Sequence, residues 1–197
     1  PSLPPPVYAP QSRDPAPPPA SYAKTSGGFF RDSSIHDMDM ARYLLEEPIA
    51  RVYASGACLV SDELGAVGDI DTGMIALTTG SGRIATLMCS RRGPMGYDQR
   101  LEAFCANEVL TVGNQRQSTL VVSTPEGETV QPPMNYFLER FTQAYADEME
   151  AFVQLLTDGT PPLATMADGL EAQRLVEAAI QSLATGQPVD LTPDWTP

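Results

Sequence analysis

The feature that most constrains the fold is a change of hydrophobic period near residue 135. Upstream of it, six segments alternate apolar and polar residues or are rich in β-branched ones, which is typical of strands. These segments are residues 49–60, 70–79, 84–90, 98–107, 108–114 and 118–127. Downstream of it, two long segments repeat apolar residues at helical spacing. A block of strands followed by a block of helices predicts an α+β fold.

The links between the predicted strands are short, and the sequence Gly-Ser-Gly-Arg at residues 80–83 is typical of a hairpin turn. We therefore predict one large open sheet, mainly antiparallel, with the helices against one face. Residues 74–77 and 87–89 are apolar at consecutive positions, so both faces of these strands carry apolar side chains. A second protein surface should cover the open face, which predicts a homo-oligomer. A monomer with one wetted sheet face is the alternative.

The two helical segments cover residues 136–159 and 166–186. Gly159 ends the first and Gly186 ends the second. Each segment has an apolar stripe that we expect to face the core. The first stripe is Phe137, Phe141, Ala144, Tyr145, Met149, Phe152, Val153 and Leu156, and the second is Leu170, Leu175, Val176, Ala179, Ile180 and Leu183.

The N-terminal residues differ in composition from the rest. Residues 1–20 contain nine prolines, which neither continue a helix nor donate to a strand ladder. We interpret them as an extended leader or a divergent linking segment. The main domain is expected over residues 21–190, and residues 191–197 form a short tail.

Charge and cysteine content exclude several classes of protein. The net charge of −13 would repel phosphate, so neither nucleic-acid binding nor docking on an anionic membrane is expected. No run of about 18 apolar residues exists, and the N-terminus has no signal-peptide pattern. Cys58, Cys89 and Cys105 lie far apart in apolar runs, so we expect reduced, buried thiols and a cytoplasmic protein. No zinc-ligand spacing is present, so no metal site is expected.

Chemistry-bearing residues concentrate in "GGFFRDSSIHDMDMARYLL", residues 27–45, which contains His36, the single histidine of the chain. A helix is predicted over residues 33–45, with Asp32 or Ser33 as its cap. Asp32 and His36 are four residues apart and would project from one side of adjacent turns. A carboxylate beside an imidazole raises the basicity of the ring, which suits a general base. Asp39 would lie on the same face.

Other interpretations of this stretch stay open on spacing alone. An acid-flanked histidine near a helix start is often a surface feature, and an Asp-x-x-x-His pair without a third ligand is a weak metal site. Gly27 and Gly28 permit either a tight turn or close approach to a ligand. A second polar group, in residues 90–100, includes Arg91, Arg92 and Tyr97. These are usually solvated loop residues, but the arginines could meet an acid or a phosphate. No dinucleotide fingerprint, Walker A loop or nucleophile elbow is present.

Several segments, in this order, resemble the C-terminal domain of the glucose–fructose oxidoreductase and inositol dehydrogenase family, and most closely its inositol 2-dehydrogenases. They are "SRDPAPPPASYAKTSGGFFRDSSIHDMDMARYLL", "GDIDTGMIAL", "SRRGPMGYDQRLEAF", "YFLERFTQAYADEMEAFV" and "DGLEAQRLVEAAIQSL". The resemblance covers nearly all of residues 11–190. It implies a two-domain enzyme in which an N-terminal Rossmann domain binds NAD(P) and the open sheet builds an oligomer, commonly a tetramer.

The resemblance also implies roles for individual residues. His36 would be the general base that takes the proton of a substrate hydroxyl, and Asp32 would position that hydroxyl. Substrate-binding side chains would come from Asp14, Ser33, Asp39 and Tyr97. The implied reaction is the NAD-dependent oxidation of a cyclic polyol, with myo-inositol to 2-keto-myo-inositol as the first expectation.

Two departures from the family pattern qualify this expectation. Residues 1–10 do not resemble the strand that normally precedes "SRDP", and the family's Glu-Lys-Pro motif is missing. The chain therefore matches the second domain only, and by itself it is expected to be inactive. The alternatives are a family member that acts on another sugar or polyol, and a non-catalytic module that oligomerises and binds polyols without turnover.

Overall fold

The computed structural model describes residues 18–192. The chain divides into two compact units. Of the described residues, 18–92 and 163–192 form one unit, called here the sheet unit, and 93–162 form the other, called here the hairpin unit. The sheet unit carries the helix that contains Asp32 and His36, so it positions the candidate site.

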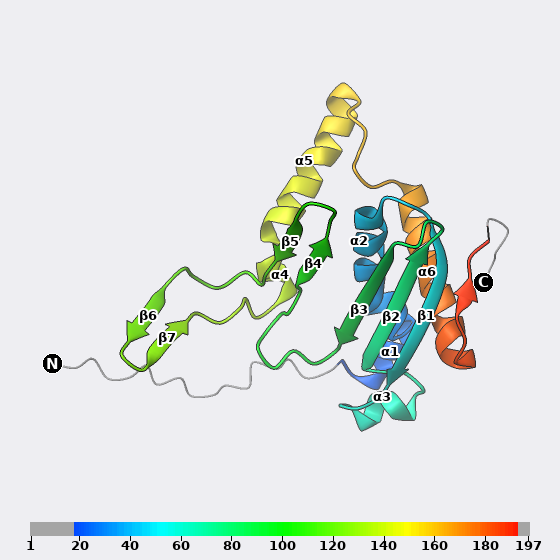
Figure 1. The fold of residues 1–197 in the computed structure, drawn as a ribbon, viewed down its shortest axis with the longest axis horizontal. Coiled ribbons are helices and arrows are strands. Elements are labelled where there is room, and N and C mark those ends of the chain that lie inside the picture. Colours follow the sequence, from blue (N-terminus) through cyan, green and yellow to red (C-terminus); the bar gives the residue numbers. More distant parts are fainter. Residues whose placement is uncertain (1–17, 193–197) are drawn as a thin grey trace. The chain divides into compact units, whose positions relative to one another are not determined.

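The sheet unit is built on a four-stranded antiparallel sheet with the order β3-β2-β1-β8 (Figure 1). Its strands are β1 (Ile49–Ala57), β2 (Thr72–Thr79), β3 (Ile84–Ser90) and β8 (Val189–Asp190). Residues 80–83 connect β2 to β3 as the predicted hairpin turn. Alternate residues of β2 are fully buried and partly buried, because one face of the sheet is covered and the other is not.

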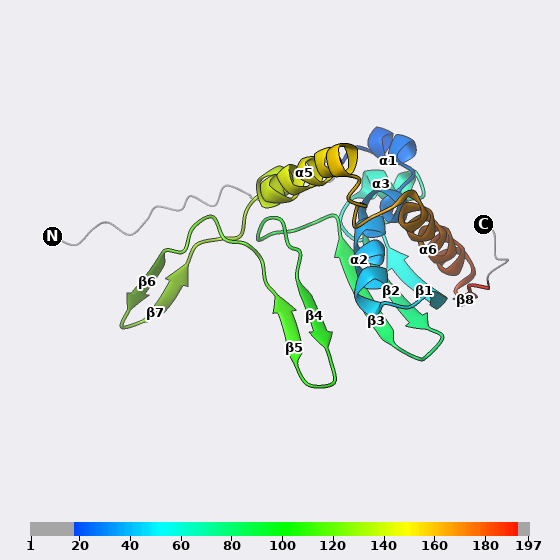
Figure 2. The same ribbon diagram turned by 90° about the horizontal axis from the view of Figure 1, so that it is seen from above.

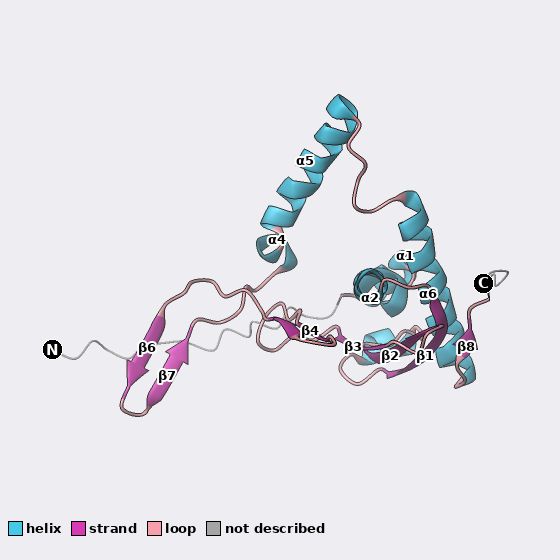
Figure 3. Cartoon of the chain, turned by 45° about the horizontal axis from the view of Figure 1, so that its top comes forward, coloured by secondary structure: helices cyan, strands magenta, loops and turns pink. Residues whose placement is uncertain are grey.

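Two helices, α2 (Ile35–Leu45) and α6 (Met166–Thr185), pack on one face of this sheet. The unit also contains α1 (Ala20–Ser26), the π-helical turn η1 (Phe30–Ser34) and α3 (Asp62–Ala66). Figure 3 shows α2 and α6 on the same side of the sheet. The core between the two layers includes Phe29, Met38, Val52, Ile75 and Leu175. The predicted α+β class, with antiparallel strands and helices on one face, is therefore confirmed.

The start of the site helix differs from the prediction. Helical backbone has already begun before Asp32, so Asp32 and Ser33 lie inside η1 and neither is an N-cap. The N-cap positions are Phe29 for η1 and Ser34 for α2, and no side-chain cap bond is formed at either. Some apolar residues that were predicted to face the core are exposed. They are Met40 and Leu44 on α2 and Leu170 on α6. α6 begins with a capping box, in which Thr165 and Asp168 bond each other's backbone N–H groups.

The strands of the hairpin unit form two separate two-stranded antiparallel sheets (Figure 2). One pairs β4 (Leu101–Phe104) with β5 (Val109–Val112), and the other pairs β6 (Val121–Thr124) with β7 (Gly127–Val130). The described strands are thus divided among three sheets, whereas the sequence predicted one. The spacing of the segments could not show this, because the pairing of strands depends on how the links between them fold. Cys105, predicted to be buried, is exposed at the end of β4.

The helical part of the hairpin unit consists of α4 (Phe137–Arg140) and α5 (Thr142–Asp158). The expectation that its apolar stripe faces a core is wrong for α5. Exposed members of the stripe are Ala144, Tyr145, Met149, Phe152, Val153 and Leu156. The reason is that no described element of this unit covers that side of the helix, so helical periodicity indicated an amphipathic helix but not what it packs against.

Candidate functional site

The candidate site lies where η1 joins α2. The N–H group of Ile35 donates to the carbonyl of Phe30, which closes the wider π-helical turn around Asp32. Such turns are frequent at functional sites. Gly27 and Gly28 precede this turn with φ values of 88° and 87°, which strongly favour glycine. The structure therefore supports the turn interpretation of this glycine pair.

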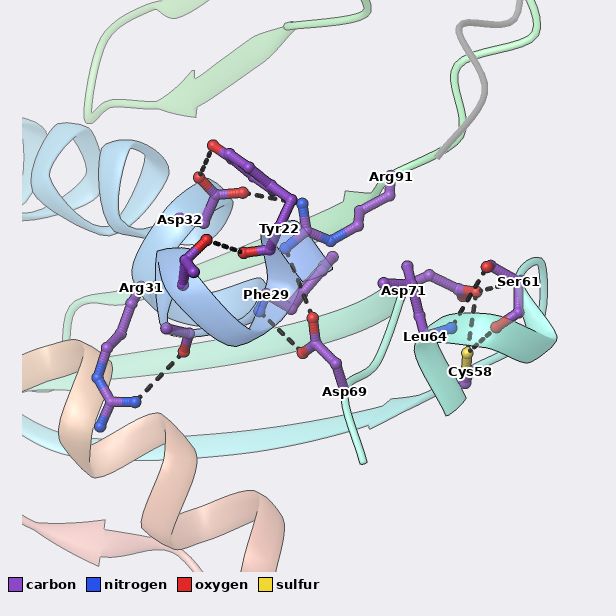
Figure 4. A network of polar contacts seen from close by, with 12 residues as sticks. Tyr22, Phe29, Arg31, Asp32, Cys58, Ser61, Leu64, Asp69, Asp71 and Arg91 are labelled. Carbon is purple, nitrogen blue, oxygen red and sulfur yellow. Dashed lines mark hydrogen bonds and ion pairs between the residues drawn. The ribbon is translucent and has the colours of Figure 1, made fainter. Parts of the chain in front are cut away.

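Both carboxylate oxygens of Asp32 are engaged (Figure 4). The hydroxyl of Tyr22 on α1 donates to Oδ1 at 2.8 Å. Nη1 of Arg91, the residue directly after β3, donates to Oδ2 at 2.9 Å. Three segments of the sheet unit thus meet at this side chain, and the two donors fix the plane of the carboxylate.

The side chain of Arg91 is only 5% exposed, so the interpretation of it as a solvated loop residue is wrong. It meets two acids, because its Nη2 also lies 3.6 Å from Oδ2 of Asp69. Its guanidinium carbon lies 5.7 Å from the centre of the Phe29 ring. Oδ1 of Asp69 in turn accepts the backbone N–H of Phe29 at 2.9 Å, which ties this carboxylate to the start of the site helix.

The imidazole of His36 is exposed and makes no hydrogen bond or ion pair to residues 18–192. It follows Asp32 by four residues in continuous helical backbone, so the two side chains leave adjacent turns. The expected direct contact between them is not formed, since Asp32 is bound by Tyr22 and Arg91. An exposed, unbonded imidazole remains accessible to a ligand.

The remaining predicted site residues are placed as follows. Ser33 is partly buried on η1. Asp39 accepts a hydrogen bond from Arg42 at 3.2 Å, and Arg42 also binds Asp168 at 2.6 Å. Tyr97 belongs to the hairpin unit, where its ring packs edge-on against Phe141 with centroids 5.7 Å apart. Asp14 lies outside the described residues.

Asp37 lies about one helical turn after Asp32. Its Oδ2 accepts a hydrogen bond from the thiol of Cys89 on β3 at 3.4 Å. Burial and the nearby carboxylate of Asp37 raise the pKa of this thiol to about 12. Cys89 therefore stays protonated at neutral pH and is unsuited to act as a nucleophile.

Residues 18–192 contain no group of three or more His, Cys, Asp and Glu side chains that could hold a metal ion. None of their helices is both long and apolar enough to span a bilayer. The Gly27–Gly28 pair follows helix α1, whereas a dinucleotide fingerprint follows a strand, so these residues do not fit a nicotinamide cofactor.

Residues 5–191 match the model of an oxidoreductase family, specifically its C-terminal alpha/beta domain, denoted GFO_IDH_MocA_C. The chain belongs to this family. It is 40% identical over 180 residues to myo-inositol 2-dehydrogenase of Thermotoga maritima. That alignment covers 91% of this chain and 54% of the relative, so the chain spans about half the length of the curated relatives it matches.

Solved structures of the family agree with the fold. Myo-inositol dehydrogenase from Corynebacterium glutamicum superposes with a TM-score of 0.85 at 39% identity, over 91% of this chain and 54% of that one. Scyllo-inositol dehydrogenase from Lactobacillus casei, solved with bound NAD(H) and scyllo-inositol, gives 0.78 at 27% identity, over 87% and 52%. The resemblance stated from the sequence is thereby confirmed at the level of the family.

Sequence reasoning did not identify Tyr22 or Asp69 as parts of the site and treated Arg91 as a generic polar residue. Tyr22 precedes Asp32 by 10 residues and Arg91 follows it by 59, so no local spacing relates them. A weak signal existed at Arg91, because an arginine that directly follows an apolar strand is close to the core and needs an acidic partner.

Proposed function

We propose that the full-length protein containing this chain oxidises a secondary hydroxyl group of a cyclic polyol, with myo-inositol as the first candidate and NAD as the hydride acceptor. The family match over residues 5–191 carries this proposal. It is supported by the inositol dehydrogenases among the relatives and by the NAD(H) complex of the Lactobacillus casei enzyme. Another inositol isomer or a sugar is the alternative substrate, since a scyllo-inositol enzyme is also a relative.

In this proposal the imidazole of His36 removes the proton from the substrate hydroxyl. Its exposure leaves the ring free to reach a ligand, and imidazole is basic enough to accept a proton near neutral pH. The carboxylate of Asp32 accepts a hydrogen bond from the same hydroxyl and orients it. It can do so while bound to Tyr22 and Arg91, because each carboxylate oxygen has two acceptor positions.

Further substrate contacts are assigned to Ser33, Asp39, Tyr97 and Asp14. A polyol needs such a lining, because each hydroxyl taken from water has to find a partner. We propose that the cofactor is bound mainly by residues outside 18–192, because no dinucleotide-binding turn is found among these. No step that involves the cofactor is assigned to the described residues.

We also propose that the open face of the four-stranded sheet mediates a homo-oligomer, with a tetramer as the expected form. Met74 on β2 and Met88 on β3 are register partners, and Met88 is 73% exposed. Apolar side chains on an uncovered sheet face favour association with a second protein surface. A cytoplasmic location is proposed because all three cysteines are free thiols.

The test uses the full-length protein, NAD and a panel of myo-inositol, scyllo-inositol and glucose, with NADH formation as the readout. We expect turnover with a cyclic polyol, and His36→Ala should lower kcat by about 10²- to 10⁴-fold because general-base catalysis contributes that much. Tyr43→Ala is the matched control, since Tyr43 is an exposed residue of the same helix. Absence of NADH formation with every polyol would contradict the proposed reaction, and an unchanged rate in His36→Ala would contradict the assignment of the base.

A further inference from the structure

We propose that Arg91 is a positioning residue for Asp32, which sets the orientation of this carboxylate toward the substrate. This inference rests on the proposed function, because it needs Asp32 to contact the substrate hydroxyl. Its basis is the hydrogen bond from Nη1 of Arg91 to Oδ2 of Asp32, at 2.9 Å. Arg91 does not touch the substrate in this proposal and acts through Asp32 alone.

The burial of Arg91 argues that its charge serves a defined purpose. Removing a guanidinium from water is costly, and the cost is offset only by acidic partners in good geometry. The side chain is 5% exposed, while Asp32 and Asp69 are 19% and 13% exposed. The hydrogen bond to Oδ2 of Asp32 fixes these two side chains relative to each other, and Asp69 adds a second negative charge 3.6 Å from Nη2 without a hydrogen bond.

The position of Arg91 is itself fixed from several directions. Its backbone N–H donates to the carbonyl of Asp71 at 2.8 Å, which anchors the end of β3. The ring of Phe29, which is 1% exposed, lies under the guanidinium. Asp69, the second acid beside the guanidinium, is held by the N–H of Phe29 at the start of the site helix. Arg91 therefore links Asp32 to a rigid part of the core.

The second donor to Asp32 is much more exposed. Tyr22 is 46% exposed, and its hydroxyl reaches Oδ1 at 2.8 Å from the short helix α1. Figure 4 shows Tyr22 and Arg91 engaging different oxygens of Asp32. Since the buried donor holds Oδ2 and the exposed donor holds Oδ1, Oδ1 is the oxygen assigned to the substrate, and Arg91 is the donor that sets the carboxylate plane.

A double-mutant cycle tests this role in the full-length protein, with Arg91→Gln, Asp32→Asn and the combination. If Arg91 acts only through Asp32, Arg91→Gln should lower kcat by about 10- to 100-fold in the wild-type background, as expected for a misplaced reacting group. In the Asp32→Asn background the same substitution should change kcat by no more than about twofold. The KM for NAD should stay unchanged in every variant.

Two further variants keep the test decisive. Arg92→Gln is the matched control, because Arg92 is the exposed neighbour, and its kcat should equal that of wild type. If Arg91→Gln does not fold, Arg91→Lys replaces it in the cycle. Lysine keeps the charge but cannot engage two carboxylates with one planar group. Arg91→Lys should therefore lower kcat less than Arg91→Gln in the wild-type background, and it should not lower kcat in the Asp32→Asn background.

The outcomes separate this inference from the proposed function. Equal losses of kcat in both backgrounds, or full activity in Arg91→Lys and Arg91→Gln, would overturn the positioning role and leave the proposed reaction intact. Wild-type turnover in Asp32→Asn would remove the role of Asp32, and this inference would fall with it.

Discussion

Asp71 provides the sharpest test of how this fold is held together. Its carboxylate is fully buried and accepts the backbone N–H of Leu59 at 2.9 Å on Oδ1. Oδ2 accepts the N–H groups of Val60 and Ser61 at 2.8 and 2.9 Å. The hydroxyl of Thr72 adds a fourth bond, at 3.0 Å, and the thiol of Cys58 a fifth, at 3.3 Å. The loop between β1 and α3 is therefore folded around this one side chain, and we predict that Asp71→Asn destabilises the chain.

The magnitude follows from counting donors. Asparagine has a single acceptor oxygen, so its NH₂ group must face backbone N–H groups on one side. The less costly orientation keeps the oxygen toward Val60, Ser61 and the thiol of Cys58 and loses the bond from Leu59. The hydroxyl of Thr72 can turn and accept from the NH₂ group. A hydrogen bond to a charged group contributes about 1.5–3 kcal/mol, and the remaining bonds weaken when the charge is removed. We therefore expect the free energy of unfolding to fall by about 2–4 kcal/mol.

Urea unfolding followed by circular dichroism measures this effect. With a slope of about 2 kcal/mol per molar urea, the midpoint should fall by about 1–2 M. Asp190→Asn is the control, because Asp190 is an exposed partner of Arg51 and should leave the midpoint unchanged. A midpoint for Asp71→Asn within about 0.3 M of wild type would refute the reasoning.

The same carboxylate predicts a dependence on pH. Burial alone would raise the pKa of Asp71, but the N–H groups of Leu59, Ser61 and Val60 outweigh it and hold this pKa well below its ordinary value of 3.8. A lowered folded-state pKa contributes stability that is present above pH 3.8 and is lost as the pH falls toward the folded value. The stability gap between wild type and Asp71→Asn should therefore be constant near neutral pH and shrink progressively below about pH 4.

Two further predictions concern the thiols and the open sheet face. Iodoacetamide at mildly alkaline pH should label Cys105 before Cys89, because Cys105 is exposed and the pKa of Cys89 is about 12. Mass spectrometry measures the order of labelling. Faster labelling of Cys89 would contradict its placement. Met88→Glu should shift the full-length protein to smaller species in size-exclusion chromatography, whereas Leu59→Glu, equally exposed but outside the sheet, should not. An unchanged elution volume for Met88→Glu would count against the sheet face as the interface.

Sequence alone determined the local elements of this protein. The hairpin of β2 and β3 follows from two apolar strands around residues 80–83, and α6 follows from apolar periodicity ended by Gly186. These patterns depend only on residues close to one another in the sequence, so they can be recognised without knowledge of the rest of the fold. The placement of Asp32 and His36 on one side of one helical segment was predictable for the same reason.

Only the tertiary structure decided what surrounds those residues. The partners of Asp32 are Tyr22 and Arg91, and the loop closed by Asp71 joins residues 10 to 12 positions away. Contacts between side chains that are distant in the sequence depend on how the helices and strands pack. The spacing of neighbouring residues does not predict this packing. The exposed stripe of α5 has the same cause: periodicity determines that a helix has an apolar side, whereas the elements packed around it determine whether that side is buried.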